Sequence, residues 1–189
     1  GHPEPHNIRL WRLGNEMDGP WQIGHKTAAE YGRMAAETAR LMKMYDPKLE
    51  LIVCGSSHRG MATFGEWELT VLDHTHDWVD YISIHTYYGK YHDNTSTYLG
   101  WPDHMDRFIE EVAACVDAVA AKRRSRKRIH LSFDEWNVWG NRGGNQGVER
   151  WSVAPRSHES VYTVEDALVV SGMMIALLNH ADRVRIGCL

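Results

Sequence analysis

Five short apolar segments alternate with four segments of helical periodicity along this chain, and that alternation constrains the fold more than any other feature. The apolar segments, which we expect to be strands, are Ile8–Leu13, Leu49–Cys54, Val79–His85, Arg128–Phe133 and Val184–Leu189. The helical segments are Thr27–Tyr45, a shorter helix from Thr63 toward Asp73, Asp103–Arg124 and Thr163–His180. Strands that alternate with helices form parallel sheets with right-handed crossovers. The sequence therefore predicts an α/β fold.

Three of these helices carry further sequence signals. Thr27 and Glu30 have the spacing of a capping box, in which a hydroxyl and a carboxylate each bind a free backbone N–H. Thr63 and Glu66 have the same spacing, so we expect the second helix to begin there. The helix at 163–180 is apolar on most sides, which predicts that it is well buried.

Two architectures fit this order of elements: an open doubly wound sheet and part of a (β/α)8 barrel. The barrel is favoured for two reasons. No glycine-rich phosphate loop follows the first strand. Polar or aromatic residues follow four of the strands, and the carboxyl ends of the strands are where barrels carry their catalytic residues. Units of roughly 40 residues would need about 300 residues for eight strands, more than the usual barrel. We therefore expect the 189 residues to form the second half of a barrel, with the remaining strands supplied by another chain or segment that covers the open sheet edges.

Composition excludes several classes of partner. The formal charge of −4 and the pI near 6.3 give no reason to expect nucleic acid, and we interpret the basic run Lys122–Arg128 as a solvated helix end. No segment approaches the roughly 20 apolar residues of a membrane span. Three widely spaced cysteines and the lack of a signal-peptide pattern favour a cytoplasmic protein, with secretion as the alternative. Eight tryptophans and eight tyrosines suit a carbohydrate-binding surface, although any single ring is more often a core residue.

Two glutamates, Glu16 and Glu135, lie in aromatic-rich stretches directly after predicted strands. At the mouth of a barrel they would face the same cavity, and a pair of carboxylates there suits glycoside hydrolysis. One would act as a general acid, with a pKa raised by burial, and the other would attack the anomeric carbon or activate water. The alternative interpretation is that either glutamate is a surface or salt-bridge residue. The sequence does not give the separation that decides between retention and inversion.

Five segments resemble glycoside hydrolase family 51, the α-L-arabinofuranosidases. They are Gly14–Gln22 (GNEMDGPWQ), His85–Gly89 (HTYYG), Asp134–Trp139 (DEWNVW), Tyr162–Leu168 (YTVEDAL) and Asn179–Val184 (NHADRV). The resemblance runs in order over essentially the whole chain. It implies that residues 1–189 are about strands 4 to 8 of a (β/α)8 catalytic domain, without the N-terminal barrel half and the C-terminal β-sandwich.

The resemblance also assigns roles. It implies a retaining mechanism with Glu16 as the acid/base and Glu135 as the nucleophile, and it places five residues at the substrate: Asn15, Trp21, His85, Tyr87 and Trp139. Asn15 would bind the arabinose 2-hydroxyl, and Tyr87 would orient the nucleophile. The sugar-binding residues that the family carries on strands 1 to 3, and a glutamine after strand 8, have no counterpart here. The chain would therefore hold only part of the sugar pocket.

We therefore expect a hydrolase that removes terminal α-L-arabinofuranosyl groups from arabinoxylan, arabinan or their oligosaccharides. It would need no cofactor, and we do not expect a metal at His74 and His76. The family also implies a homo-oligomer. The alternatives are another glycosidase of the same clan, such as an endo-β-glucanase, and a non-catalytic fragment that at most binds sugars. The glycine-rich loop at 140–160 is expected to form a rim on the leaving-group side.

Overall fold

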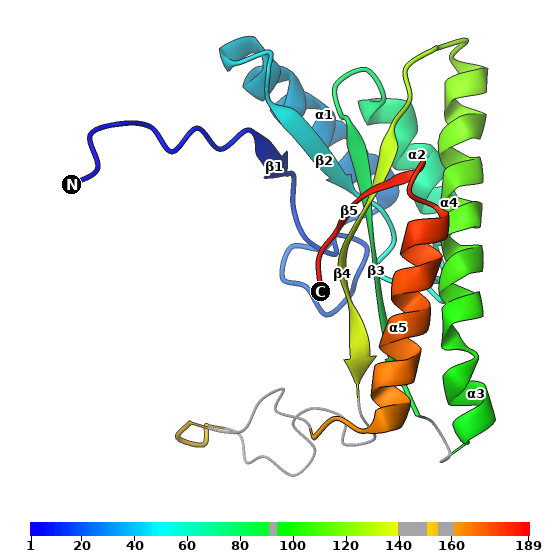
Figure 1. The fold of residues 1–189 in the computed structure, drawn as a ribbon. Helices are drawn as coiled ribbons and strands as arrows, with labels where there is room; N and C mark the ends of the chain where they lie inside the picture. The colour runs from blue at the N-terminus through cyan, green and yellow to red at the C-terminus, as the bar shows by residue number, and fades with distance from the viewer. Residues whose placement is uncertain (91–93, 140–150, 155–160) are drawn as a thin grey trace.

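The computed structural model describes residues 1–90, 94–139, 151–154 and 161–189. It contains one parallel sheet with the strand order β1-β2-β3-β4-β5 (Figure 1). The strands are β1 Leu10–Arg12, β2 Glu50–Cys54, β3 Tyr81–Gly89, β4 His130–Trp139 and β5 Val184–Gly187. All five lie within or overlap the predicted segments, so the α/β class and the parallel sheet are confirmed. The predicted rim loop at 140–160 lies mostly outside the described residues.

The helices cover one side of this sheet and leave the other side open (Figure 1). They are α1 Ala28–Tyr45, α2 Glu66–Thr75, α3 Thr95–Leu99, α4 Trp101–Lys122 and α5 Val164–Asn179. Each long helix packs on the next: α1 on α2, α2 on α4 and α4 on α5. Because the strands follow one another in chain order, there is no topological switch point of the kind that a doubly wound sheet requires. The described chain therefore forms a half-barrel sheet.

Helix beginnings follow the predicted capping chemistry at α1 and depart from it at α2. The Thr27 hydroxyl accepts the Glu30 N–H, and the Glu30 carboxylate accepts the Thr27 N–H at 3.0 Å, as predicted. The predicted start at Thr63 is wrong. The helix begins after Gly65, whose φ of +82° suits glycine, and the Glu68 carboxylate takes the Gly65 N–H at 2.8 Å.

Strands β3 and β4 run several residues beyond their predicted ends. Ser83 pairs with Ser132 and His85 pairs with Glu135, so two residues along β3 are matched by three along β4. Such an extra residue is a β-bulge, which redirects the side chains beside it. Glu135 therefore lies within a strand next to a bulge, whereas the sequence placed it after the strand.

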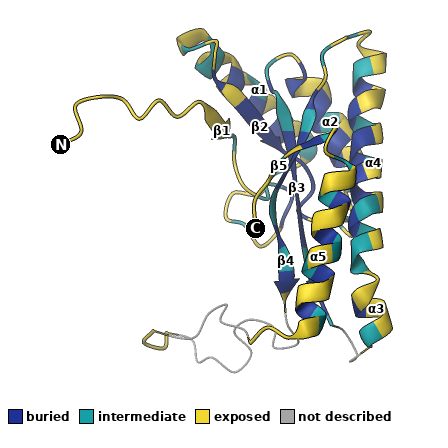
Figure 2. Ribbon diagram, viewed as in Figure 1, coloured by how far each residue is buried: buried dark blue, intermediate teal, exposed yellow. Residues whose placement is uncertain are grey.

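The core lies between the sheet and the helices. Tyr31 of α1 stacks on Trp67 of α2 at 5.6 Å, and Phe108 of α4 contacts Phe133 of β4 edge to face. The prediction that the last helix is well buried is wrong (Figure 2). Leu168 and Leu178 of α5 are 56% and 71% exposed, because no other element of the described chain packs against that face of the helix.

The basic run at the end of α4 and the lengths of the helices bear on nucleic acid and membrane as partners. The basic run after α4 pairs with acidic groups: Arg123 with Asp77 at 2.6 Å and Arg128 with Asp182 at 3.0 Å. This agrees with the solvated-end interpretation. Among the described residues, no helix combines the length and the apolar character needed to cross a membrane.

Candidate active site

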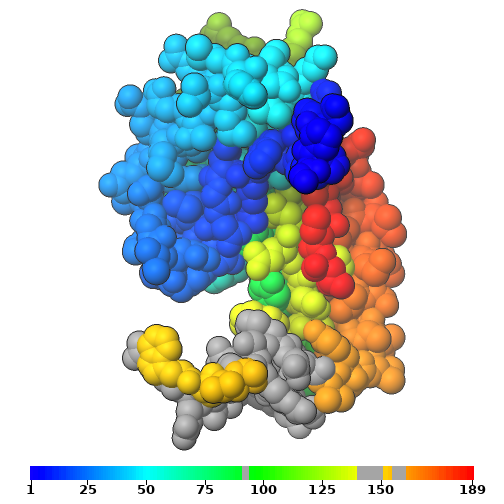
Figure 3. Space-filling view, turned by 90° about the vertical axis from the view of Figure 1, so that its left-hand side faces the viewer, coloured from blue at the N-terminus to red at the C-terminus, as the bar shows by residue number. Residues whose placement is uncertain are grey.

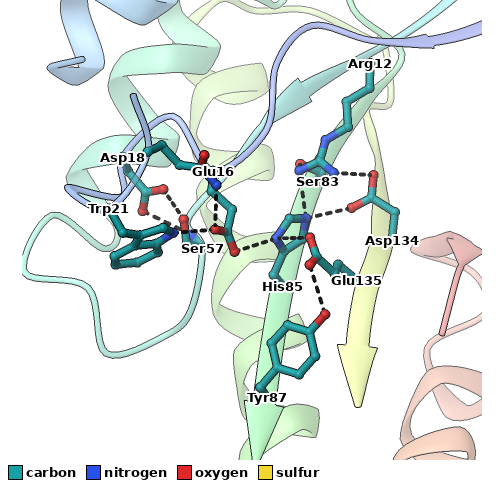
Figure 4. Close-up of polar contacts among 11 residues, drawn as sticks. Arg12, Glu16, Asp18, Trp21, Ser57, Ser83, His85, Tyr87, Asp134 and Glu135 are labelled. Atoms are coloured by element: carbon teal, nitrogen blue, oxygen red, sulfur yellow. Dashed lines mark hydrogen bonds and ion pairs between the residues drawn. The ribbon is translucent and has the colours of Figure 1, made fainter. Parts of the chain in front are cut away.

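The carboxyl ends of β1, β3 and β4 bring the predicted site residues together on the open side of the sheet (Figure 4). Glu16 comes from the loop after β1, His85 and Tyr87 from β3, and Glu135 from β4. In Figure 3, atoms of β3 and β4 form the floor of a hollow between the N-terminal segment and the last helix and strand. The structure thus places these four residues side by side, and their predicted roles stay predictions.

His85 joins the two glutamates. Its Nδ1 lies 3.1 Å from Glu16 Oε1 and 3.1 Å from Glu135 Oε2. The nearest donor atoms of these three residues all lie within 4.8 Å of one another, so the two carboxylates are close neighbours. The imidazole is buried, and it forms the floor beneath the pair.

Glu16 is held as a carboxylate, contrary to the predicted general acid of raised pKa. Burial by itself raises its pKa, but hydrogen bonds from His85, from Trp21 Nε1 at 2.5 Å and from Gln22 Nε2 at 3.1 Å outweigh burial and lower the pKa to about 2. Sequence reasoning considered the apolar surroundings and missed the three donors. Gly19 permits this arrangement, since a Cβ there would come within 2.5 Å of the Trp21 ring.

The loop that carries Glu16 has a strained backbone and is anchored to the end of β2. Glu16 has a φ of +45°, in the left-handed region that side chains other than glycine seldom adopt. Asp18 is buried, and its carboxylate accepts the Ser57 hydroxyl and the Ser57 N–H, the latter at 3.0 Å. These contacts fix the direction in which the Glu16 side chain leaves the backbone.

Glu135 contacts Tyr87, which in turn packs on Trp139. The Tyr87 hydroxyl donates to Glu135 Oε1 at 2.9 Å, and the Tyr87 ring lies 4.7 Å from that of Trp139. Burial, together with the nearby Glu135 carboxylate, raises the pKa of Tyr87, which therefore remains a donor. Asn15 is exposed and forms no side-chain hydrogen bond within the part of the chain that the structure describes, so its predicted contact with substrate stays a prediction.

A second layer that sequence reasoning missed lies behind His85. Arg12 Nη2 lies 2.7 Å from His85 Nε2 and 3.2 Å from the Ser83 hydroxyl, and Asp134 Oδ1 lies 3.2 Å from the same Nε2. Burial lowers the pKa of His85, but the carboxylates of Asp134 and Glu16 outweigh burial and raise it. The sequence offered little signal for Arg12, because the strand segment Ile8–Leu13 holds two arginines, Arg9 and Arg12.

Two groups of side chains have the geometry to bind a metal ion among the described residues. One is the candidate site itself, Glu16, His85 and Glu135, and the other is Asp106, Glu110 and His180 on α4 and at the end of α5. His74 and His76 belong to neither group. In the first group a metal would need the lone pair of the same His85 nitrogen that faces both carboxylates, which would remove the hydrogen bonds seen there.

Comparisons with known proteins match this chain to α-L-arabinofuranosidases. The family model for the α-L-arabinofuranosidase C-terminal domain matches residues 134–189. An intracellular exo-α-(1→5)-L-arabinofuranosidase from Halalkalibacterium halodurans is 60% identical over 191 residues, and one from Bacillus subtilis is 55% identical over 190 residues. A solved family 51 α-L-arabinofuranosidase from Bifidobacterium longum matches the whole chain with a TM-score of 0.93 and 40% identity.

The chain spans only part of these proteins. It covers 38% of the length of the two curated relatives and 39% of the solved Bifidobacterium longum chain, while all of this chain is matched in each case. The described site therefore corresponds to one segment of a longer relative.

Proposed function

Because the chain belongs to the α-L-arabinofuranosidases of glycoside hydrolase family 51, we propose that Glu16 and Glu135 hydrolyse terminal α-L-arabinofuranosyl groups by a retaining mechanism. The observation that carries the proposal is the approach of the two carboxylates, whose nearest oxygens lie within 4.8 Å of each other. Retaining glycosidases hold their carboxyl groups about 5–5.5 Å apart, while inverting ones leave about 6.5–9.5 Å for a water. The close approach of the two carboxylates supports retention over inversion.

In the first step a Glu135 oxygen attacks the anomeric carbon while the bond to the leaving oxygen breaks. Glu16, in the protonated form that its contacts in the free site disfavour, gives its proton to that oxygen, and a glycosyl ester of Glu135 forms. In the second step a water attacks the anomeric carbon, Glu16 takes the water proton, and the ester bond breaks to restore the Glu135 carboxylate. Tyr87 supports this division of roles, since its hydroxyl holds one Glu135 oxygen at 2.9 Å and leaves the attack to the other.

The substrate of this proposal is an arabinose-containing oligosaccharide or polysaccharide of the arabinan or arabinoxylan type. The curated relatives named above are exo-α-(1→5)-L-arabinofuranosidases, and another from Bifidobacterium longum, 47% identical, is named an exo-α-(1→6)-L-arabinofuranosidase. Trp21 and Trp139 are 53% and 47% exposed beside the two carboxylates, where their rings could cover a sugar face. An intracellular location is proposed from the names of the relatives alone.

We also propose that residues 1–189 are strands 4 to 8 of a (β/α)8 catalytic domain whose other strands come from the rest of the polypeptide. The short share of the relatives' length supports this, as does the exposed apolar face of α5. An intact mass of the natural protein under denaturing conditions tests it, because a mature chain of only 21.7 kDa would contradict it. A homo-oligomer is proposed on the family alone, and light scattering of the same sample tests that.

The test of the two roles compares Glu135→Ala with Glu16→Ala in the full-length protein. Glu135→Ala should abolish turnover of an aryl α-L-arabinofuranoside, and azide should restore it with a glycosyl azide of inverted configuration. Glu16→Ala should keep more activity on an aryl arabinoside with a good leaving group than on an arabino-oligosaccharide, because only the latter needs the acid. An unchanged rate in Glu135→Ala would disprove the mechanism.

The non-catalytic alternative rests on one observation, the 38% coverage of the relatives. The isolated segment lacks any sugar-binding groups that the rest of a longer protein supplies. Calorimetry of the isolated segment with arabino-oligosaccharides, alongside assays of the full-length protein, separates binding without hydrolysis from catalysis. A β-glucan offered in the same assays tests the endo-β-glucanase alternative.

A further inference from the structure

Among the residues labelled in Figure 4, Arg12 is the one that carries a permanent positive charge, and it lies behind the candidate site. It ends β1, and its side chain crosses toward β3 and β4, where it meets His85, Ser83 and Asp134. It contacts neither glutamate directly in the described structure. Any effect of Arg12 on the reacting carboxylates must therefore pass through His85.

The proton on His85 follows from the chemistry of its neighbours. A guanidinium has five N–H donors, accepts no hydrogen bond and does not lose its proton in proteins. Arg12 Nη2 lies 2.7 Å from His85 Nε2, so a favourable contact requires a lone pair on Nε2. A neutral imidazole with a lone pair on Nε2 carries its proton on Nδ1. That N–H then points at Glu16 Oε1 and Glu135 Oε2, each 3.1 Å away.

The neighbouring carboxylates favour the opposite state. Glu16 in the loop after β1, and Asp134 and Glu135 on β4, all face His85 and stabilise a second proton on it. Asp134 Oδ1 lies 3.2 Å from Nε2 but has no partner that meets hydrogen-bond geometry. Arg12 is thus the nearer and better-aligned group at Nε2, and it is the only cation that faces the imidazole among the described residues.

We propose that Arg12 is a positioning residue that keeps His85 Nε2 unprotonated, so that a single Nδ1–H is shared between Glu16 and Glu135. The chemical consequence concerns the acid step, and in that respect the inference rests on the proposed function. An imidazolium beneath the pair would hold Glu16 as a carboxylate, whereas a neutral imidazole leaves Glu16 better able to accept the proton that it must deliver. Arg12 thus favours the acid form of a residue that it does not touch.

The first measurement reads the imidazole without reference to turnover. The full-length protein is labelled with 15N at the histidine rings, and the His85 signals are identified by their loss in His85→Asn. At pH values above the His85 titration, the natural protein should carry the single ring proton on Nδ1 and none on Nε2. In Arg12→Leu the second proton should bind at a pH at least about one unit higher, since the removal of a charge at this range shifts titration by about 1–3 units. A neutral ring that carries its proton on Nε2 in the natural protein would overturn the inference.

Three further variants separate charge from hydrogen bonding and from general damage. Arg12→Lys keeps the charge and one donor and should restore most of the natural titration, while Arg12→Gln keeps only a donor and should restore less. Arg40→Leu makes the same change as Arg12→Leu on an exposed position of α1 and should leave the His85 signals unchanged. Melting temperatures of all four variants identify any that fail to fold.

The second measurement is the pH profile of kcat/KM on an aryl α-L-arabinofuranoside. In Arg12→Leu the acid limb should move to higher pH together with the His85 titration, and kcat should fall about tenfold with little change in KM. A uniform loss at every pH, with an unmoved His85 titration, would show that Arg12 is merely structural. If the natural protein shows the expected tautomer but no hydrolysis, the proposed function fails while the assignment of the proton stands.

Discussion

Tyr87 and Tyr88 provide a matched pair of tyrosines in which only one hydroxyl faces the candidate nucleophile. They are consecutive residues of β3, so their side chains leave opposite faces of the sheet. The Tyr87 hydroxyl donates to Glu135 at 2.9 Å, while the Tyr88 hydroxyl lies 2.9 Å from His104 Nδ1 of α4, on the helical side. The substitutions Tyr87→Phe and Tyr88→Phe each remove one oxygen atom and leave the rings in place.

The expected effects differ in kind. A hydrogen bond to a charged group contributes about 1.5–3 kcal/mol, and about 1.4 kcal/mol is a factor of ten in rate. Tyr87→Phe should therefore lower kcat/KM by roughly 10- to 100-fold, because the hydroxyl positions the Glu135 oxygens for attack. Tyr88→Phe removes a hydrogen bond between neutral groups and should cost about 1 kcal/mol of stability with little change in rate.

The assay is steady-state hydrolysis of an aryl α-L-arabinofuranoside by the full-length protein, with urea unfolding of the same samples. A loss of less than about threefold in Tyr87→Phe, below the lower end of the expected range, would refute the reasoning. An equal loss of rate in both variants would also refute it, because the effect would then reflect general damage to β3.

Three further predictions follow from the loop that carries Glu16. Gly19→Ala should push the Trp21 ring away from Glu16, because a Cβ would come within 2.5 Å of that ring, and should lower kcat/KM about tenfold with little loss of stability by unfolding. Glu16→Gln should be less stable than the natural protein by at most roughly 3 kcal/mol above pH 4.5, as measured by urea unfolding. The folded pKa of about 2 lies below the ordinary value, so this difference in stability should shrink as the pH falls from 4.5 toward 2. Asp18→Ala should cost about 1–3 kcal/mol and lower activity, because two buried donors of Ser57 lose their acceptor; an unchanged melting temperature would contradict this.

Sequence periodicity was sufficient for the sheet and for the side on which the site lies. The alternation of strands and helices predicts parallel strands, and parallel strands place the residues at their carboxyl ends together. That is why Glu16, His85 and Glu135, far apart in sequence, lie together at one edge of the sheet. The capping box at Thr27 was correct for a similar reason, since it depends only on residues three apart.

The errors concern features that depend on tertiary contacts. The bulge between β3 and β4 has no local signature, yet it aims Asp134 and Glu135 at the same imidazole. Helix α2 begins after Gly65 and not at Thr63, because the Glu68 carboxylate accepts the Gly65 N–H. The same carboxylate accepts the Ser56 N–H at 2.7 Å, a contact that sequence spacing does not reveal. The direction of the Glu16 pKa shift likewise depended on three donors whose approach no spacing reveals.

The short distance between the two glutamates therefore requires an explanation beyond strand order. In a flat sheet, β1 and β4 are three strand spacings apart, about 14 Å. Glu16, however, lies beyond the end of β1, in a loop that Asp18 fastens to Ser57 at the end of β2. The loop thus carries Glu16 across β2 to His85 on β3, while the bulge turns Glu135 of β4 toward the same ring. The close approach of the two carboxylates is therefore set by one loop anchor and one bulge, and both glutamates meet at the imidazole of His85.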